Sequence, residues 1–438
     1  MSGTPNGTCA WPWSARFWRR YFSPAATTGS WRRLRRDARR GRTLLRGDGG
    51  DTIMTIKKIE LLRFGVPFET GGPRFGFRPG ANDNPWTVKE CLMVRIETED
   101  GMEGWGESFG HLSNPSTMAM LENLIAPWFI GRDEADLEDL MEGANKAFFG
   151  FGRQGPCMYA LSGIDIALWD LRAKRAGKPL YQLLGGPEGD VEITRYASLM
   201  RYGGDTEAVA RNTARAADLG FPMVKLHERD MPSFMAAREA APEGVAITLD
   251  VNCPWSVEDA VAIARELKQR EHVKGGFLWL EEPVWPPEDF DGLAKVRAEG
   301  TGISGGENIG SAMEFSHAIQ AGAFDILQPS IAKVGGVSVS KQVFEMGRAA
   351  GVRVVGHSFY WGPGYVATAH VLGAQPAPAA GQPHWLETAF IDYAENPHDL
   401  VDPFDPVMML RADRPGLGFN PDMAHLQKYL IARAEISA

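Results

Sequence analysis

Acidic residues follow three apolar segments in the second half of the sequence. Asp250 comes directly after VAITL, Glu281 after FLWL and Glu307 after TGISGG. Carboxylates brought together in one place repel one another unless a cation lies among them. Oxygen ligands with no interleaved Cys or His favour a hard cation, most simply Mg²⁺, over zinc. We therefore interpret the three acids as metal ligands, although any one of them alone would equally fit a helix cap or a solvent-facing acid.

Further apolar runs also end in polar residues. Lys225 and His227 close FPMVKLH, Ser330 follows FDILQP, His357 follows VRVVG and Glu387 follows HWL. Apolar runs of four to eight residues, separated by helical segments rich in Ala, Glu, Lys and Arg, predict buried parallel strands joined by right-handed crossovers. Because the polar residues always stand at the carboxyl end of a strand, the series predicts a closed barrel whose functional face gathers those ends.

The motifs, taken in order, resemble those of a known family. They are EGWGE, SGIDIALWDLRAKRAGKPLYQLLGG, KLH, LDVN, LEEP, GGEN, QPSIAKVGG, GHSF and PGLGFNPD. From Met54 onward the sequence resembles the mandelate racemase branch of the enolase superfamily. The resemblance implies a TIM-like (β/α)7β barrel with an α+β capping domain. It also assigns the LEEP ligand to Glu281 rather than Glu282, since side chains alternate along a strand and both cannot face the barrel mouth.

The resemblance divides the chain into four parts. We expect residues 1–53 to be a disordered or non-native extension, residues 54–185 the capping domain with its lid loops, and residues 186–400 the barrel. Residues 401–438 are expected to return to the capping domain. A chain of 438 residues is too long for one ordinary core, which agrees with two domains.

The amino-acid composition restricts the kinds of partner that we expect this protein to bind. Residues 1–53 hold eleven Arg and three Asp, so the rest of the chain is strongly acidic, which argues against nucleic acid as a partner. The sequence has no apolar run of eighteen residues, so we expect no membrane span. Four Cys without CxxC spacing favour a reducing, cytoplasmic setting. The resemblance further implies a homo-oligomer and a small-molecule carboxylate substrate.

The resemblance also implies the reaction class. Removal of a proton next to a carboxylate creates extra negative charge, which Mg²⁺ and fixed donors stabilise. We expect a lyase that dehydrates a sugar acid. The alternatives are a racemase or epimerase, a cycloisomerase, and a metal- and ligand-binding relative without turnover.

One face of the expected site departs from the usual pattern. Relatives carry K-x-K at the end of the second barrel strand, with the first Lys beside the substrate carboxylate and the second acting as a base. This sequence has Lys225-x-His227. Imidazoles titrate near neutrality, so His227 remains suited to proton exchange. The alternative is that Glu228 and Asp230 hold His227 without chemistry.

The other face departs further. In relatives, the His on this face is paired with an Asp that orients it. In this sequence the His is His357, and Ser330 stands at the position of the Asp. A hydroxyl holds one imidazole tautomer but does not stabilise an imidazolium as a carboxylate does. We therefore expect His357 to be a weaker base than its counterpart and to assist the leaving group as an acid. Asp325, earlier on the same strand, is expected to be too deep to help.

The remaining candidates contact the substrate. By resemblance, Glu387 donates a hydrogen bond to the substrate carboxylate; an ordinary acid at the strand end is the alternative. The long loop between the first two strands is expected to be a lid, with the segment from Phe109 to Pro115 as its companion. The candidate substrate-binding residues are Arg74, Arg78, His111, Asn252 and Ser330.

Overall fold

The computed structural model describes residues 54–72, 86–376 and 383–437. All of them belong to one compact unit of the chain. The expected extension 1–53 and the two lid arginines, Arg74 and Arg78, lie outside the described residues. No helix in the three described ranges is long and apolar enough to cross a membrane.

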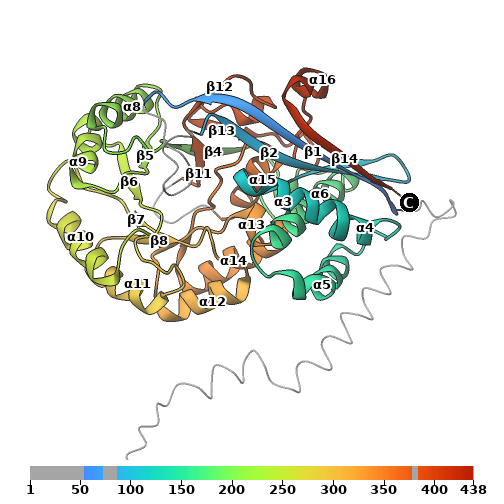
Figure 1. Ribbon diagram of the computed structural model, residues 1–438, viewed down its shortest axis with the longest axis horizontal. Coiled ribbons are helices and arrows are strands. Elements are labelled where there is room, and N and C mark those ends of the chain that lie inside the picture. The colour runs from blue at the N-terminus through green and yellow to red at the C-terminus, as the bar shows by residue number, and fades with distance from the viewer. Residues whose placement is uncertain (1–53, 73–85, 377–382, 438) are drawn as a thin grey trace, which may run out of the picture. The chain divides into compact units, whose positions relative to one another are not determined.

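Eight parallel strands form the barrel. They are β4 (Val191–Ser198), β5 (Met223–Leu226), β6 (Ala246–Asp250), β7 (Leu280–Glu281), β8 (Ile303–Gly305), β9 (Ile326–Leu327), β10 (Arg353–Val354) and β11 (Trp385–Ala389). The pairing order is β10-β9-β8-β7-β6-β5-β4-β11. This curled parallel sheet confirms the expected barrel architecture (Figure 1). β10 and β11 end the path, and Ser358 after β10 reaches across by donating to Glu387 of β11.

Helices surround the strands on the outside, as Figure 1 shows for the first five. They are α8 (Thr206–Asp218), α9 (Met231–Ala240), α10 (Val257–Gln269), α11 (Phe290–Arg297), α12 (Ala312–Ala321), α13 (Ile331–Val334), α14 (Gly336–Ala350) and α15 (Pro363–Gly373). An Asp or Ser side chain caps each helix from α8 to α12 by accepting a first-turn N–H. Such caps are worth about 1 kcal/mol each, and they fix where each loop at the barrel mouth ends.

The inner face of the barrel follows the two-residue period of a strand. In or beside three strands, an apolar residue comes two positions before a polar residue of the mouth: Met223 before Lys225, Trp279 before Glu281, and Val355 before His357. The three apolar residues belong to one buried cluster with Tyr196 and Ile326. The barrel is therefore packed below its mouth, and the polar groups rest on that packing.

The capping part is an antiparallel sheet with helices. Its strands are β1 (Ile56–Glu69), β2 (Val88–Thr98), β3 (Glu103–Ser108), β12 (Asp392–Tyr393) and β14 (Leu430–Ser437). Its helices are α3 (Asn114–Met120), α4 (Ala126–Phe129), α5 (Leu137–Phe148), α6 (Pro156–Arg175) and α7 (Leu180–Leu183). The β2–β3 hairpin turns at Gly101, whose φ of 81° suits glycine. Gly104 and Gly106 of β3 face α6 so closely that any Cβ would clash with its backbone.

The end of the chain contributes to both sheets. β12 pairs with the end of β1, and β14 pairs with β1 from Lys58 to Phe64. Between them, β13 (Val407–Leu410) pairs antiparallel with β4 of the barrel sheet. The short helix α16 (Met423–Leu426) precedes β14. The chain therefore returns to the cap before residue 401, and part of the tail extends the barrel sheet.

Buried polar groups join the cap to the barrel. Glu107 of β3 accepts backbone N–H bonds from Gly362 and Gly364 at 3.0 and 2.9 Å, where α15 begins. At the end of β1, Tyr202 of the barrel donates to the Thr70 carbonyl at 3.0 Å, and Asn212 of α8 donates to the Gly71 carbonyl at 3.1 Å. The loop that carries His357 is thus anchored on the cap.

Candidate active site at the carboxyl ends of the barrel strands

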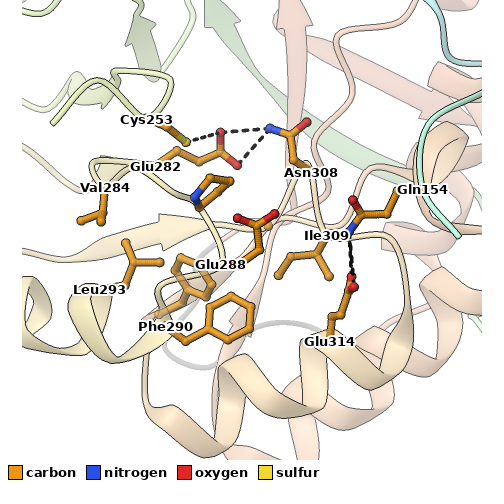
Figure 2. Close-up of a pocket in the computed structure, with 13 residues that line it drawn as sticks. Gln154, Cys253, Glu282, Val284, Glu288, Phe290, Leu293, Asn308, Ile309 and Glu314 are labelled. Carbon is orange, nitrogen blue, oxygen red and sulfur yellow. Dashed lines mark hydrogen bonds between the residues drawn. The ribbon is translucent and has the colours of Figure 1, made fainter. Parts of the chain in front are cut away.

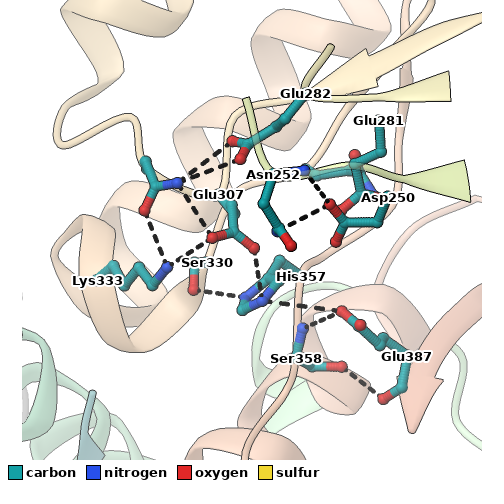
Figure 3. A network of polar contacts seen from close by, with 12 residues as sticks. Asp250, Asn252, Glu281, Glu282, Glu307, Ser330, Lys333, His357, Ser358 and Glu387 are labelled. Carbon is teal, nitrogen blue, oxygen red and sulfur yellow. Dashed lines mark hydrogen bonds and ion pairs between the residues drawn. The ribbon is translucent and has the colours of Figure 1, made fainter. Parts of the chain in front are cut away.

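Three carboxylates converge at the barrel mouth (Figure 3). Asp250 and Glu281 are register partners on β6 and β7, and Glu307 follows β8 by two residues. One oxygen from each acid lies within 4.8 Å of the other two. Hard oxygen donors of this kind suit Mg²⁺, so the three residues fit the metal that the sequence implies.

Lys225 of β5 lies among the carboxylates. Its Nζ is 3.0 Å from Asp250 Oδ2, 3.1 Å from Glu281 Oε1 and 2.7 Å from Glu387 Oε1. All four side chains are almost fully buried. Burial alone would lower the pKa of Lys225, but the surrounding carboxylates raise it well above its ordinary value. Lys225 is therefore a fixed positive charge in the mouth.

The ligand carboxylates differ in charge. Burial favours the neutral form of Asp250, but Lys225 and His227 hold its pKa below the ordinary value. Burial and the neighbouring Asp250 raise the pKa of Glu281 well above its ordinary range, in spite of Lys225. Gln328 donates to Glu281 Oε2 at 2.7 Å and so fixes its orientation. A bound divalent cation would remove the repulsion that raises the pKa of Glu281.

Glu282 points away from the mouth. Its backbone has a φ of 46°, and its carboxylate accepts from Asn308 Nδ2 at 3.3 and 3.4 Å and from Cys253 Sγ at 3.6 Å. It lines a separate pocket of about 200 Å³ whose other walls include Phe290 and Leu293 (Figure 2). Burial, with Glu307 and Asp250 adding repulsion, raises the pKa of Glu282 to about 8.

The backbone beside the ligands is strained. Asn252, Cys253 and Glu282 have φ values of 51°, 52° and 46°, and none is glycine. The Cys253 N–H donates to the Glu282 carbonyl at 2.7 Å, so the two strained segments hold each other. Left-handed residues of this kind cost of order 1 kcal/mol or more each and cluster at functional sites.

His227 approaches the carboxylates from the β5 side. Its Nδ1 lies 2.5 Å from the Leu199 carbonyl, and its Nε2 lies 3.2 Å from Asp250 Oδ2. A carbonyl only accepts, so Nδ1 carries a hydrogen and Nε2 faces the mouth. Glu228 instead accepts the Gly204 N–H, and Asp230 caps α9. The alternative in which these two acids hold His227 is therefore wrong.

His357 approaches from the opposite side. Its Nε2 lies 2.9 Å from Glu307 Oε2, and its Nδ1 lies 2.9 Å from Ser330 Oγ (Figure 3). Ser330 is fully buried, and its hydroxyl also bonds to Tyr360. It therefore orients His357, and its expected contact with a substrate stays a prediction. Asp325 pairs with Arg297 at 2.7 Å and takes no part in the site.

Glu387 forms a buried ion pair with Lys225. It is completely buried, and its ion pair with Lys225 lowers its pKa to about 2 even though burial opposes ionisation. An ionised carboxylate only accepts hydrogen bonds. Donation of a hydrogen bond by Glu387 to a substrate carboxylate would require it to be protonated, and this role stays a prediction.

Asn252 and His111, which were expected to contact the substrate, contact other side chains in the structure. Asn252 directs both its backbone N–H and its Nδ2 to Asp250 Oδ1, at 3.1 and 2.9 Å, and so positions that ligand. The ring of His111 lies among aromatic side chains of the cap and barrel, 5.8 Å from the ring of Phe359. Phe359 in turn lies 6.5 Å from the ring of His227. The ring of Phe359 is thus a neighbour of both His111 and His227, the candidate base.

Several site residues were not predicted from the sequence. Lys333 donates to Glu307 Oε1 at 3.1 Å. Its position in the motif QPSIAKVGG was the feature of the sequence that could have identified it. Gln328 precedes Ser330 by two positions, so the strand period would have placed it on the same face. Tyr360 had no such signal, because it lies in an irregular loop.

A carboxylate-lined cation site with an imidazole on either side, at the mouth of a parallel barrel, defines a class of metal-assisted barrel enzymes. The chain belongs to the mandelate racemase and muconate lactonizing enzyme family of the enolase superfamily. Residues 86–185 match the mandelate racemase / muconate lactonizing enzyme N-terminal domain, and residues 208–425 match the enolase C-terminal domain-like family.

Characterised relatives share most of the chain. D-galactarolactone cycloisomerase of Agrobacterium fabrum is 31% identical over 384 residues, which cover 83% of this chain and 95% of that protein. Arabinonate dehydratase of Saccharolobus solfataricus is 29% identical over 75% of this chain and 88% of that protein. The structure of Salmonella typhimurium L-talarate/galactarate dehydratase with Mg and L-lyxarohydroxamate superposes with a TM-score of 0.73, at 25% identity, over 90% of this chain and 97% of that one.

Proposed function

We propose that the protein is a magnesium-dependent lyase that removes the proton α to a carboxylate and eliminates water from a hydroxylated sugar acid. The observation that carries this proposal is the meeting of Asp250, Glu281 and Glu307, with His227 on one side and His357 on the other. Relatives named as arabinonate and L-talarate/galactarate dehydratases support the same reaction class.

Asp250, Glu281 and Glu307 would hold the metal. When bound there, a divalent cation supplies stabilisation of the negative charge that develops on the substrate carboxylate. Lys225 is already ionised and fixed by three carboxylates, so it serves as a second positive charge beside that carboxylate. Because both charges are held before the substrate arrives, little reorganisation is needed during the reaction.

His227 is the proposed base. Its Nδ1 hydrogen is committed to the Leu199 carbonyl, so Nε2 is the nitrogen that takes the α-proton. His357, on the opposite side, assists departure of the β-hydroxyl group. The α-carbon loses its proton to His227, the β-carbon–oxygen bond breaks, and the departing hydroxyl takes a proton from His357 Nε2 and leaves as water. The enol that remains becomes a 2-keto-3-deoxy acid.

The test is a screen of acid sugars with and without Mg²⁺. We expect at least one aldonate or aldarate to give a 2-keto-3-deoxy acid, with the rate lost on chelation. Uptake of solvent deuterium at the α-carbon without loss of water would instead show a racemase or epimerase. Inactivity throughout the library, combined with tight binding of Mg²⁺ and an acid sugar, would show a binding protein and overturn the proposal.

We also propose that the protein acts in the cytoplasm as a homo-oligomer, on a small-molecule acid rather than on nucleic acid or a membrane. The acidic charge of the chain and the free thiols of Cys91, Cys157 and Cys253 support these settings. Light scattering coupled to size exclusion tests the oligomer. A monomer at micromolar concentration would contradict it.

A further inference from the structure

Tyr360 links two segments of the barrel mouth. It lies three residues after His357 and is 6% exposed. Its hydroxyl oxygen accepts the backbone N–H of Ala332 at 3.2 Å and also contacts Ser330 Oγ. Ser330 Oγ lies 2.9 Å from His357 Nδ1. The four groups form one buried chain of hydrogen bonds that ends on the imidazole.

The direction of donation along this chain of hydrogen bonds follows from its first member, the N–H of Ala332. The Ala332 N–H can only donate, so it fills one lone pair of the Tyr360 oxygen. In the described part of the chain, Ser330 Oγ is the acceptor available to the Tyr360 hydroxyl hydrogen. The Ser330 hydrogen is then left for His357 Nδ1. Nδ1 accepts, and the hydrogen of the neutral ring resides on Nε2.

The reverse direction leaves groups unsatisfied. If Nδ1 donated to Ser330 and Ser330 donated to Tyr360, the buried Tyr360 hydrogen would have no acceptor in the described residues. An unsatisfied buried donor costs about 1–3 kcal/mol, which favours the first direction by roughly 5- to 150-fold.

We propose that Tyr360 is a positioning residue that fixes His357, through Ser330, in the tautomer with its hydrogen on Nε2. His357 then offers the substrate a hydrogen-bond donor, whereas His227 offers a lone pair. An Asp at position 330 would act oppositely, since a carboxylate only accepts and would hold the hydrogen on Nδ1. The functional part of this inference rests on the proposed dehydration; the tautomer does not.

The tautomer can be measured without any substrate. In full-length protein with ¹⁵N-labelled histidine, the ring nitrogens of His357 are assigned by comparison with His357→Asn, and protonated and unprotonated nitrogens differ in chemical shift. We expect Nε2–H in the native protein, both with and without Mg²⁺, because the Ser330 side does not involve the metal ligands. Nδ1–H in the native protein would overturn the inference.

Three variants sharpen the test. Tyr360→Phe should remove the bias and give mixed tautomers, while Ser330→Asp should reverse it to Nδ1–H. Tyr365→Phe is the matched control, since it removes another buried hydroxyl of the same region, one bonded to Thr388 rather than to Ser330. An unchanged tautomer in Tyr360→Phe would show that Tyr360 has no such role. If that variant does not fold, Ser330→Ala removes the same bond to Nδ1 and should also give mixed tautomers.

Kinetics then connect the tautomer to the reaction. With a substrate found in the screen, Tyr360→Phe should lower kcat for dehydration at least about tenfold, with little change in KM, while α-proton exchange continues. Equal loss of exchange and dehydration would contradict a role on the leaving-group side. If no acid sugar is turned over, the proposed function fails, but the measured tautomer still decides the role of Tyr360.

Discussion

Lys225 Nζ lies 3.1 Å from Glu281 Oε1, so an ammonium already occupies part of the space between the proposed metal ligands. Glu281→Gln removes one negative oxygen from that set. We expect Mg²⁺ affinity to fall at least about 100-fold, because the ligand charge around the cation drops and Lys225 repels it more strongly. Isothermal titration with Mg²⁺ measures the change.

The neighbouring acid supplies the matched control. Glu282→Gln changes a carboxylate that bonds to Asn308 and Cys253 and lines the adjoining pocket. Its Mg²⁺ affinity should stay within a few fold of the native value. If Glu282→Gln lost the metal and Glu281→Gln kept it, the assignment of ligands would be reversed.

The two imidazoles should separate the two halves of the reaction. His357→Asn should block loss of water while α-proton exchange with solvent deuterium continues, because the proposed base is untouched. His227→Asn should stop exchange and dehydration together. Mass spectrometry of recovered substrate and product in deuterium oxide measures both. Loss of both activities in His357→Asn, with both intact in His227→Asn, would make His357 the base.

Lys89 is expected to destabilise the fold. It is fully buried, its Nζ lies 3.3 Å from the centre of the Phe359 ring, and it has no hydrogen-bond acceptor in the described residues. Burial lowers its pKa from 10.5 to about 7, although Glu107 and Glu387 oppose this change. The unfolded chain therefore binds more protons between these two values. The penalty is full below pH 7 and fades as the pH rises to about 10.5.

Replacement of this lysine tests that reasoning. Lys89→Met should raise the free energy of unfolding by at most about 5 kcal/mol near pH 6, and the gain should shrink toward pH 10. Urea titrations at several pH values measure it. Lys58→Met is the control, since Lys58 pairs with Glu97 at the surface and its loss should change stability by less than about 1 kcal/mol. Destabilisation in Lys89→Met would show that its ammonium has a structural partner.

Glu107 should matter for both stability and turnover. Glu107→Gln replaces one acceptor oxygen by an NH₂ group that faces backbone N–H donors of the α15 loop. We expect a loss of about 1–3 kcal/mol in thermal or urea unfolding, together with a lower kcat because the same loop carries His357. Glu103→Gln, at the other end of EGWGE, is the control and should be nearly neutral. Equal effects of the two changes would contradict the assigned role.

The sequence predicted the strand ends well because their pattern is strong. A buried parallel strand has to stop where its backbone and side chains meet water, and polar residues mark that point along the chain. Asp250, Glu281 and Glu307 could be placed together from this rule alone, before any contact was known. The two-residue period of a strand also places Gln328 on the same face as Ser330.

The sequence predicted hydrogen-bond partners less well, because these depend on distances between segments. The sequence predicts Ser330 as an incomplete replacement for a carboxylate, but its effect depends on Tyr360, which reaches it from an irregular loop. The ion pair of Glu387 with Lys225 was not predicted, because it depends on the length of Lys225, which reaches across three strands. Neither the Ser330–Tyr360 contact nor the Lys225–Glu387 ion pair follows from a period or spacing that can be recognised in the sequence.

The pairing of β14 with β1 has a consequence for chain connectivity. Lys58 and Ser437 are direct neighbours across that ladder, so the two ends of the folded unit meet at one sheet edge. A circular permutant that joins residue 437 to residue 54 by a short linker, and opens at Gly275 between α10 and β7, should keep the same pairings. No atom lies within 4 Å of a Cβ placed at Gly275, so new termini are tolerated there. The second half of the barrel, from β7 onward, would then be synthesised before the cap and the first half, without a change in the architecture of the mouth.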